Sequence, residues 1–147
     1  MGKYRLTIEL VPDGCWRGNL RSQLPPALWD VVRRDAYKRA HGRCAVCGAA
    51  GRLEAHEQWS YDETRALQRL EDVVALCRNC HEVKHIARAQ MMGRGLDVME
   101  HFMKVNACTQ SEYHAALAEA NEQHKRRNRI EDWTTDMLTW LKERFDF

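Results

Sequence analysis

The cysteines and histidines of this chain are the residues whose types and spacing could support metal chemistry. Four cysteines form two Cys-x-x-Cys pairs, Cys44 with Cys47 and Cys77 with Cys80. A zinc ion takes four thiolates in a tetrahedral arrangement, and each short pair can deliver two of them from one tight turn. In a chain without an export signal, such pairs indicate zinc more than disulfides. We therefore expect a structural zinc ion on these four residues.

Three histidines lie between and after these pairs, and their spacing favours a second, open metal site. His81 and His85 are four residues apart at the start of an expected helix, so both imidazoles lie on one face and can share an ion. His56 ends the short strand that precedes them. If zinc ties the strand side to the start of the helix, His56 is brought toward the pair. We expect a closed thiolate site that shapes the fold and an open imidazole site.

An open divalent site beside a free histidine suits the hydrolysis of phosphodiester bonds. The cation neutralises charge that builds on the scissile phosphate and on the leaving oxygen. A neutral imidazole titrates near physiological pH, so it can take a proton from water without unusual tuning. The other histidines and the two remaining cysteines are interpreted as surface or packed residues: His41, His101, His114, His124, Cys15 and Cys108.

Hydrophobic periodicity and turn residues predict the elements that must position these side chains. Residues 4–11 alternate apolar and polar side chains, which indicates a strand, and the prolines at 25 and 26 open a helix. In chain order we expect a strand over 4–11, a loop or arm over 15–21, a helix over 27–40, a strand over 52–56, a short helix or helical loop over 62–69, a strand over 73–76 and a helix over 79–90.

Three further helices are expected after residue 90. Apolar residues fall at helical spacing around 96–103 and 113–120, and a last helix is predicted over 131–144. That last helix carries a stripe of Trp and Met side chains, which is more often core than a ligand site. The basic run at 125–129 could contact phosphates or form an exposed helix end.

Charge and composition are typical of a globular chain with a basic N-terminal part. The 23 Lys and Arg against 21 Asp and Glu give a net charge of +2, yet residues 1–43 hold nine basic and four acidic residues. This part could bind nucleic acid by releasing phosphate counterions, or form a solvated helix face. Apolar runs are too short to cross a bilayer and no signal-peptide core is present, so we expect a cytoplasmic protein without a membrane partner.

These motifs together resemble the zinc-bound, four-cysteine branch of the HNH endonuclease family. The resemblance covers about residues 41–90 and rests on the first cysteine pair, on Leu53-Glu54-Ala55-His56, and on Leu76-Cys77-Arg78-Asn79-Cys80-His81-Glu82-Val83-Lys84-His85. It implies cleavage of DNA by a ββα-metal core, in which two strands and a helix hold one divalent ion. The expected fold is then α+β and mainly helical. A zinc-stapled, treble-clef-like core over 41–90 would lie between an N-terminal strand, arm and helix over 1–40 and a helical region over 91–147.

The resemblance also implies roles for individual residues. His56 matches the general base that activates water, and His81 and His85 match the helix positions that hold or surround the catalytic ion. That ion would be a divalent cation such as Mg²⁺, Mn²⁺, Ni²⁺ or Zn²⁺. The position of the family's middle asparagine is taken by Asp72, a candidate catalytic residue that could still bond the loop backbone and fix its shape.

One metal-ligating position of the family is altered in this chain. The residue before the base is commonly Asp or His, but here it is Ala55. Glu54 shares the strand face of His56 and is a candidate for the missing metal ligand. Glu57 also flanks His56, but its use would need a bend in the chain.

Contacts to nucleic acid are expected from basic residues near this core. Arg17 and Arg21 lie on the arm that follows Trp16, and Lys84 and Arg88 lie on the helix that begins at the second cysteine pair. Trp16 itself could instead pack against the core. Trp59 could form a wall of the pocket or belong to the core.

Two other functions remain open from the sequence. With Ala55 and Asp72 in place of the usual residues, the chain could be a catalytically inactive HNH-like module that binds nucleic acid or a protein partner. It could also be a structural zinc adaptor in which the histidines are incidental. The helical region over 91–147 could carry a protein contact or a homodimer interface.

Overall fold

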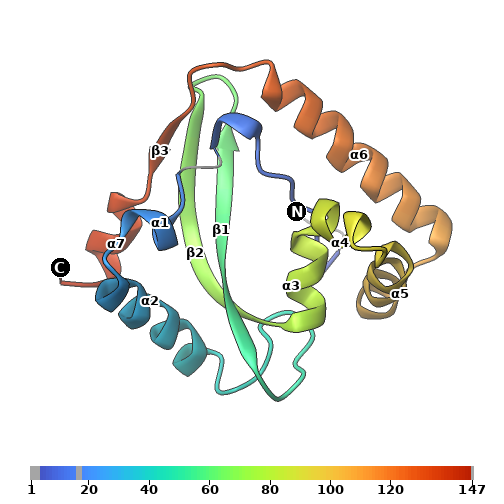
Figure 1. Ribbon diagram of the computed structural model, residues 1–147, viewed down its shortest axis with the longest axis horizontal. Helices are drawn as coiled ribbons and strands as arrows, with labels where there is room; N and C mark the ends of the chain where they lie inside the picture. Colours follow the sequence, from blue (N-terminus) through green and yellow to red (C-terminus); the bar gives the residue numbers. More distant parts are fainter. Residues whose placement is uncertain (1–3, 16–17, 147) are drawn as a thin grey trace.

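A long antiparallel hairpin runs through the centre of the molecule (Figure 1). The computed structural model describes residues 4–15 and 18–146. Strands β1 (Leu53–Asp62) and β2 (Leu67–Cys77) pair along their whole length, with His56 opposite Val74 and a register shift at Gln58. A short strand, β3 (Thr134–Asp136), adds to β2 in the parallel direction, which gives the order β1-β2-β3.

The hairpin turn replaces the helix that was expected over 62–69, so that prediction is wrong. The carboxylate of Asp62 accepts hydrogen bonds from the backbone N–H groups of Thr64 and Arg65, and this closes the turn locally. Ala66 then adopts a left-handed conformation with φ of +53°. From Leu67 onward the chain continues the ladder, so both expected short strands extend into one long pair.

Two apolar clusters cover the two faces of the hairpin. One face presents Ala55, Leu70 and Val73 to α1 (Leu20–Gln23), α2 (Pro26–Arg39) and α7 (Leu138–Arg144). The other presents Val74 and Leu76 to the remaining helices, which lie together on the right of Figure 1: α3 (Arg78–Lys84), α4 (Ile86–Met91), α5 (Gly95–Asn106) and α6 (Gln110–Asn128). The α+β, mainly helical class is confirmed.

The N-terminal segment is not the expected strand over 4–11, because it pairs with no strand among the described residues. The side chain of Asn106 on α5 takes the place of a strand partner. It accepts from the backbone N–H of Leu6 at 2.9 Å and donates to the carbonyl of Leu6 at 2.8 Å. Leu6 is fully buried in the second cluster. The alternation of apolar and polar side chains over 4–11 therefore reflects the packing of this segment against helices, and the segment does not belong to a sheet.

Two predicted helices are divided or shortened. The helix expected over 79–90 consists of α3 and α4, separated by His85 with φ of −111° and ψ of 46°. The helix expected over 131–144 is wrong in its first half, because Thr134–Asp136 is β3 and only Leu138–Arg144 is helical. The 3-10 turn η1 (Asp13–Cys15) ends where the arm expected over 15–21 begins, and the short helix α1 starts at the last two residues of that arm.

The two helices expected around 96–103 and 113–120 are α5 and α6, and α6 begins with a capping box formed by Thr109 and Glu112. None of the described helices combines the length and apolar character that crossing a bilayer requires.

Candidate metal centres

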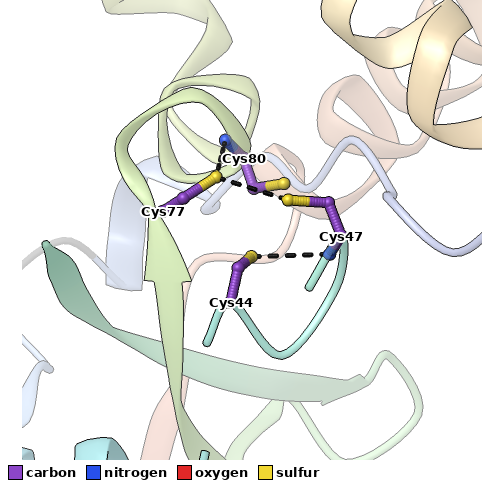
Figure 2. Close-up of side chains that lie close together, drawn as sticks. All are labelled: Cys44, Cys47, Cys77 and Cys80. Carbon is purple, nitrogen blue, oxygen red and sulfur yellow. Dashed lines mark hydrogen bonds between the residues drawn. The ribbon is translucent and has the colours of Figure 1, made fainter. Parts of the chain in front are cut away.

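The four paired cysteines come together at one end of the hairpin (Figure 2). Their sulfur atoms all lie within 4.8 Å of one another, and Sγ of Cys47 is 3.6 Å from Sγ of Cys77. Cys44 and Cys47 lie in a tight loop before β1, while Cys77 ends β2 and Cys80 lies in the first turn of α3. No disulfide joins the described cysteines. Four sulfurs so placed can hold one metal ion such as zinc.

Backbone geometry directs the sulfurs toward this centre. The N–H groups of Val46 and Cys47 point at Sγ of Cys44 at 3.4 and 3.5 Å, and the N–H of Cys80 points at Sγ of Cys77 at 3.4 Å. Burial raises the pKa of the Cys44 thiol, but these backbone donors more than offset it and lower the pKa to about 7. Burial and the neighbouring sulfurs raise the pKa of Cys80. Adjacent thiolates repel one another, so the cluster favours a neutralising cation.

A histidine from outside the motif also reaches this cluster. Nε2 of His101 on α5 lies 3.2 Å from Sγ of Cys80. Burial lowers the pKa of His101, with a further contribution from Lys104. From the sequence, His101 is expected to be a surface or packed residue, because no local pattern connects it with the cysteines. Its contact ties α5 to the edge of the four-sulfur cluster.

His56, His81 and His85 form the second cluster. One ring nitrogen of each lies within 4.8 Å of the others. The ring centroids of His81 and His85 are 4.7 Å apart, and that of His56 is 5.3 and 6.1 Å from them. His56 comes from β1, His81 from α3, and His85 from the junction between α3 and α4. Hairpin and helix therefore bring together the residues that spacing alone suggested.

His81 and His85 face each other in a geometry that suits a shared cation. Nδ1 of His81 lies 2.8 Å from Oε1 of Glu54, and the two Nε2 atoms lie 3.1 Å apart. Because an ionised carboxylate only accepts, Nδ1 of His81 carries the proton and Nε2 keeps its lone pair. Two imidazole nitrogens bound to one ion at ~2.1 Å each lie about 3.0 Å apart in octahedral geometry and about 3.4 Å apart in tetrahedral geometry. Burial, and then His81 and His56, lower the pKa of His85 to about 4, which favours the neutral, metal-binding form.

His56 is enclosed on its inner side. Its side chain is 11% exposed, and Nε2 is a buried atom with no hydrogen-bond partner among the described residues. The nearest carboxylate oxygen is Oε2 of Glu9, 3.6 Å away. Burial lowers the pKa of His56, against the opposing effect of Glu9.

Glu9 is a residue that the sequence analysis missed. It comes from the N-terminal segment, and its other oxygen bonds Nζ of Lys84 at 3.1 Å and Oγ1 of Thr7 at 3.0 Å. Burial raises the pKa of Glu9, but the contacts with His56 and Lys84 more than offset it and lower the pKa to about 2. One acidic residue in an alternating segment gives no signal of this contact.

Lys84 differs from its expected placement. Its side chain is only 3% exposed and its ammonium is engaged by Glu9 and Thr7. It is therefore not part of the surface that a phosphate could reach.

Two acidic candidates lie away from the histidines. Glu57 projects from the opposite face of β1, where the backbone N–H of Leu20 donates to it at the start of α1, and burial raises its pKa to about 7. Oδ1 of Asp72 accepts from the N–H of Val73 at 2.8 Å and lies 3.4 Å from Nη1 of Arg39. Asp72 thus fixes local backbone but does not join the cluster. Trp59 packs against the core with α1, α2 and α7.

A groove of about 870 Å³ opens beside the histidine cluster, with His81 and His85 in its wall. Arginines from both sides of the hairpin line it. Arg33 is paired with Asp30, and Arg94 with Glu82. Four others are exposed and have no acidic partner among the described residues: Arg21, Arg52, Arg78 and Arg88. The expected contacts Arg21 and Arg88 therefore lie on one surface, whereas Arg17 and Trp16 lie outside the described residues.

No family model matches this chain, and the comparisons with curated proteins and with solved structures find no match.

None of the basic residues at 125–129 lines the groove, and the charge of this run is partly neutralised by an acidic residue. Arg126 and Arg127 both bond the carboxylate of Glu63 in the hairpin turn. Because Glu63 engages two of its cations, this run is a structural link between α6 and the hairpin.

Proposed function

We propose that the chain is a metal-dependent endonuclease of HNH type that hydrolyses phosphodiester bonds in DNA. The observation that carries this proposal is the convergence of His56, His81 and His85 beside a groove whose lining includes four arginines without an acidic partner in the described part of the chain. The chain order of β1, β2 and α3, with histidines on the first strand and on the helix, supports a ββα-metal core. A zinc ion on the four cysteines would fix the start of α3 to the end of β2.

The contacts favour His56 as a third metal ligand, which differs from the base role that the resemblance implied. A general base exchanges protons with water, whereas His56 is enclosed and its ring lies against both other imidazoles. Glu54 is then the carboxylate partner of His81, which sets the tautomer that binds metal, and is not a ligand itself. A divalent cation held by the three imidazoles would supply Lewis-acid stabilisation of the phosphate and lower the pKa of water.

The arginines of the groove account for the class of substrate. Guanidinium groups bind phosphate oxygens through paired donors, and a row of them follows a phosphodiester backbone. Arg78 and Arg88 flank the histidines on the helical side, while Arg21 lies across the groove on α1. A strand of DNA seated between these walls would present its phosphates to the exposed edge of His85.

A plasmid-cleavage assay tests the proposal. The zinc-loaded protein is incubated with supercoiled DNA and Mg²⁺, Mn²⁺, Ni²⁺ or Zn²⁺, beside His85→Ala and the exposed control His114→Ala. We expect cleavage by the parent and by His114→Ala, and a loss of about 100-fold or more in His85→Ala. Absence of cleavage with every cation, together with retained DNA binding, would overturn the nuclease and favour the inactive binding module.

A further inference from the structure

The N-terminal segment brings a half-buried carboxylate, that of Glu9, to the histidine cluster from outside the core over 41–90. Glu9 lies between His56 and Lys84, with one oxygen 3.6 Å from Nε2 of His56 and the other 3.1 Å from Nζ of Lys84. Lys84 immediately precedes His85 in the chain and donates a second hydrogen bond, at 2.8 Å, to Oγ1 of Thr7. The ammonium thus holds the carboxylate from the side opposite His56.

The buried Nε2 atom of His56 lies close to one carboxylate in the described part of the chain, that of Glu9. Solvent does not reach this atom, and it makes no hydrogen bond with the described residues. Buried polar nitrogens in folded proteins are nearly always bonded, because desolvation without a partner is costly. A carboxylate accepts from an N–H, so closure of the 3.6 Å gap would place the proton of His56 on Nε2.

We propose that Glu9 is a positioning residue of the three-histidine site. Its carboxylate accepts a hydrogen bond from Nε2–H of His56, and this leaves the other ring nitrogen of His56 to bind the divalent cation. The inference rests on the proposed function and adds a residue to the same site. Glu9 would then serve His56 as Glu54 serves His81. In metal sites, loss of such a carboxylate typically weakens metal binding by 10- to 100-fold.

Calorimetric titration with Ni²⁺ of protein that already holds one zinc ion tests this role. Glu9→Gln removes the charge and keeps the shape of the side chain. Asp13→Asn is the matched control, because it removes a carboxylate charge from the same N-terminal segment, where Asp13 contacts His124 and Asn128 instead of Glu9. We expect Ni²⁺ binding about 10-fold weaker in Glu9→Gln and at the parent affinity in Asp13→Asn. Cleavage by Glu9→Gln should recover at saturating Ni²⁺, which a general loss of structure would not allow.

A second variant covers the case in which Glu9→Gln leaves Lys84 uncompensated and unfolds. Glu9→Leu with Lys84→Met removes both charges of this ion pair, and thermal melting and zinc content report whether the double variant is folded. The same weakening of Ni²⁺ binding is expected in this folded double variant. Equal affinity in the parent and in a folded Glu9 variant would overturn the role of Glu9 alone. No Ni²⁺ binding by the zinc-loaded parent would overturn the three-histidine site and with it the proposed function.

Discussion

Nε2 of His81 lies 3.1 Å from Nε2 of His85, while Nδ1 of the same His81 ring is bonded to Glu54. The carboxylate on one side therefore fixes which nitrogen is free on the other. Two lone pairs at this separation repel each other unless a proton or a cation lies between them. With the pKa of His85 lowered to about 4, a proton on His85 is disfavoured at neutral pH, and the proposed divalent cation would separate the two lone pairs.

The role of His56 can be separated from that of a base by measuring metal binding. In His56→Ala we expect Ni²⁺ affinity to fall by about 100-fold, because one of three ligands is lost, and cleavage to fall with it. Calorimetry on zinc-loaded protein measures the affinity, and His114→Ala provides the exposed control. If His56→Ala binds Ni²⁺ as tightly as the parent but no longer cleaves DNA, His56 is the general base and not a metal ligand.

The four-cysteine cluster should be required for folding. Cys77→Ser removes a sulfur from the end of β2 and the cap of α3, so we expect loss of bound zinc and a lower free energy of unfolding by several kcal/mol. Zinc content by elemental analysis and a denaturant titration measure both effects. Cys108→Ala lies outside the cluster and should keep one zinc per chain; loss of zinc there would show that the ion is not held by the four paired cysteines.

Groove arginines should control the salt dependence of DNA binding. Arg52→Ala and Arg88→Ala should each weaken binding, and each should reduce the slope of log affinity against log salt by about 1. Fluorescence anisotropy over a range of salt concentrations measures this slope. Arg34→Ala is the control, because Arg34 is exposed on α2 but does not line the groove. An equal change in the control would mean that DNA binds elsewhere.

The contact between the hairpin turn and α6 should depend on pH. A hydrogen bond from Arg126, together with Arg127, lowers the pKa of Glu63 to about 2, against a small opposing effect of burial. A depressed acid stabilises the fold above its unfolded pKa, and this contribution is lost as the pH falls from about 4.5 to 2. Thermal melting should show a smaller acid-induced decrease in Glu63→Gln than in the parent. The same decrease in both proteins would contradict the prediction.

The sequence was most informative where short-range spacing determines geometry. Cys44 with Cys47 and His81 with His85 are local pairs, so a turn or a helix was enough to predict that each pair shares a face. Asp62 shows the opposite case. Its neighbours fit a helix by composition, but its carboxylate closes a turn, and the pairing of β1 with β2 then outweighs local propensity.

Long-range partners were not predictable, because no local pattern encodes them. Glu9 reaches the histidine cluster through its contact with Lys84 on α3. His101 lies on α5 and reaches the cysteine cluster through its contact with Cys80 on α3. Lys84 was expected to contact nucleic acid, but its side chain is buried and its ammonium bonds Glu9, which lies 75 residues away in the sequence. The α+β class and the local pairs therefore follow from the sequence, whereas the contact of Glu9 and the burial of Lys84 require the tertiary structure.

The two hydrogen bonds between the side chain of Asn106 and the backbone of Leu6 have a consequence for biosynthesis. Leu6 is made 100 residues before the side chain that bonds its backbone. During translation, the cysteine loop, the hairpin and α3 therefore leave the ribosome before Asn106 is made. Lys84 on α3 can already bond Glu9 and Thr7 at that stage. The backbone of Leu6 gains its side-chain partner only after α5 has emerged and folded.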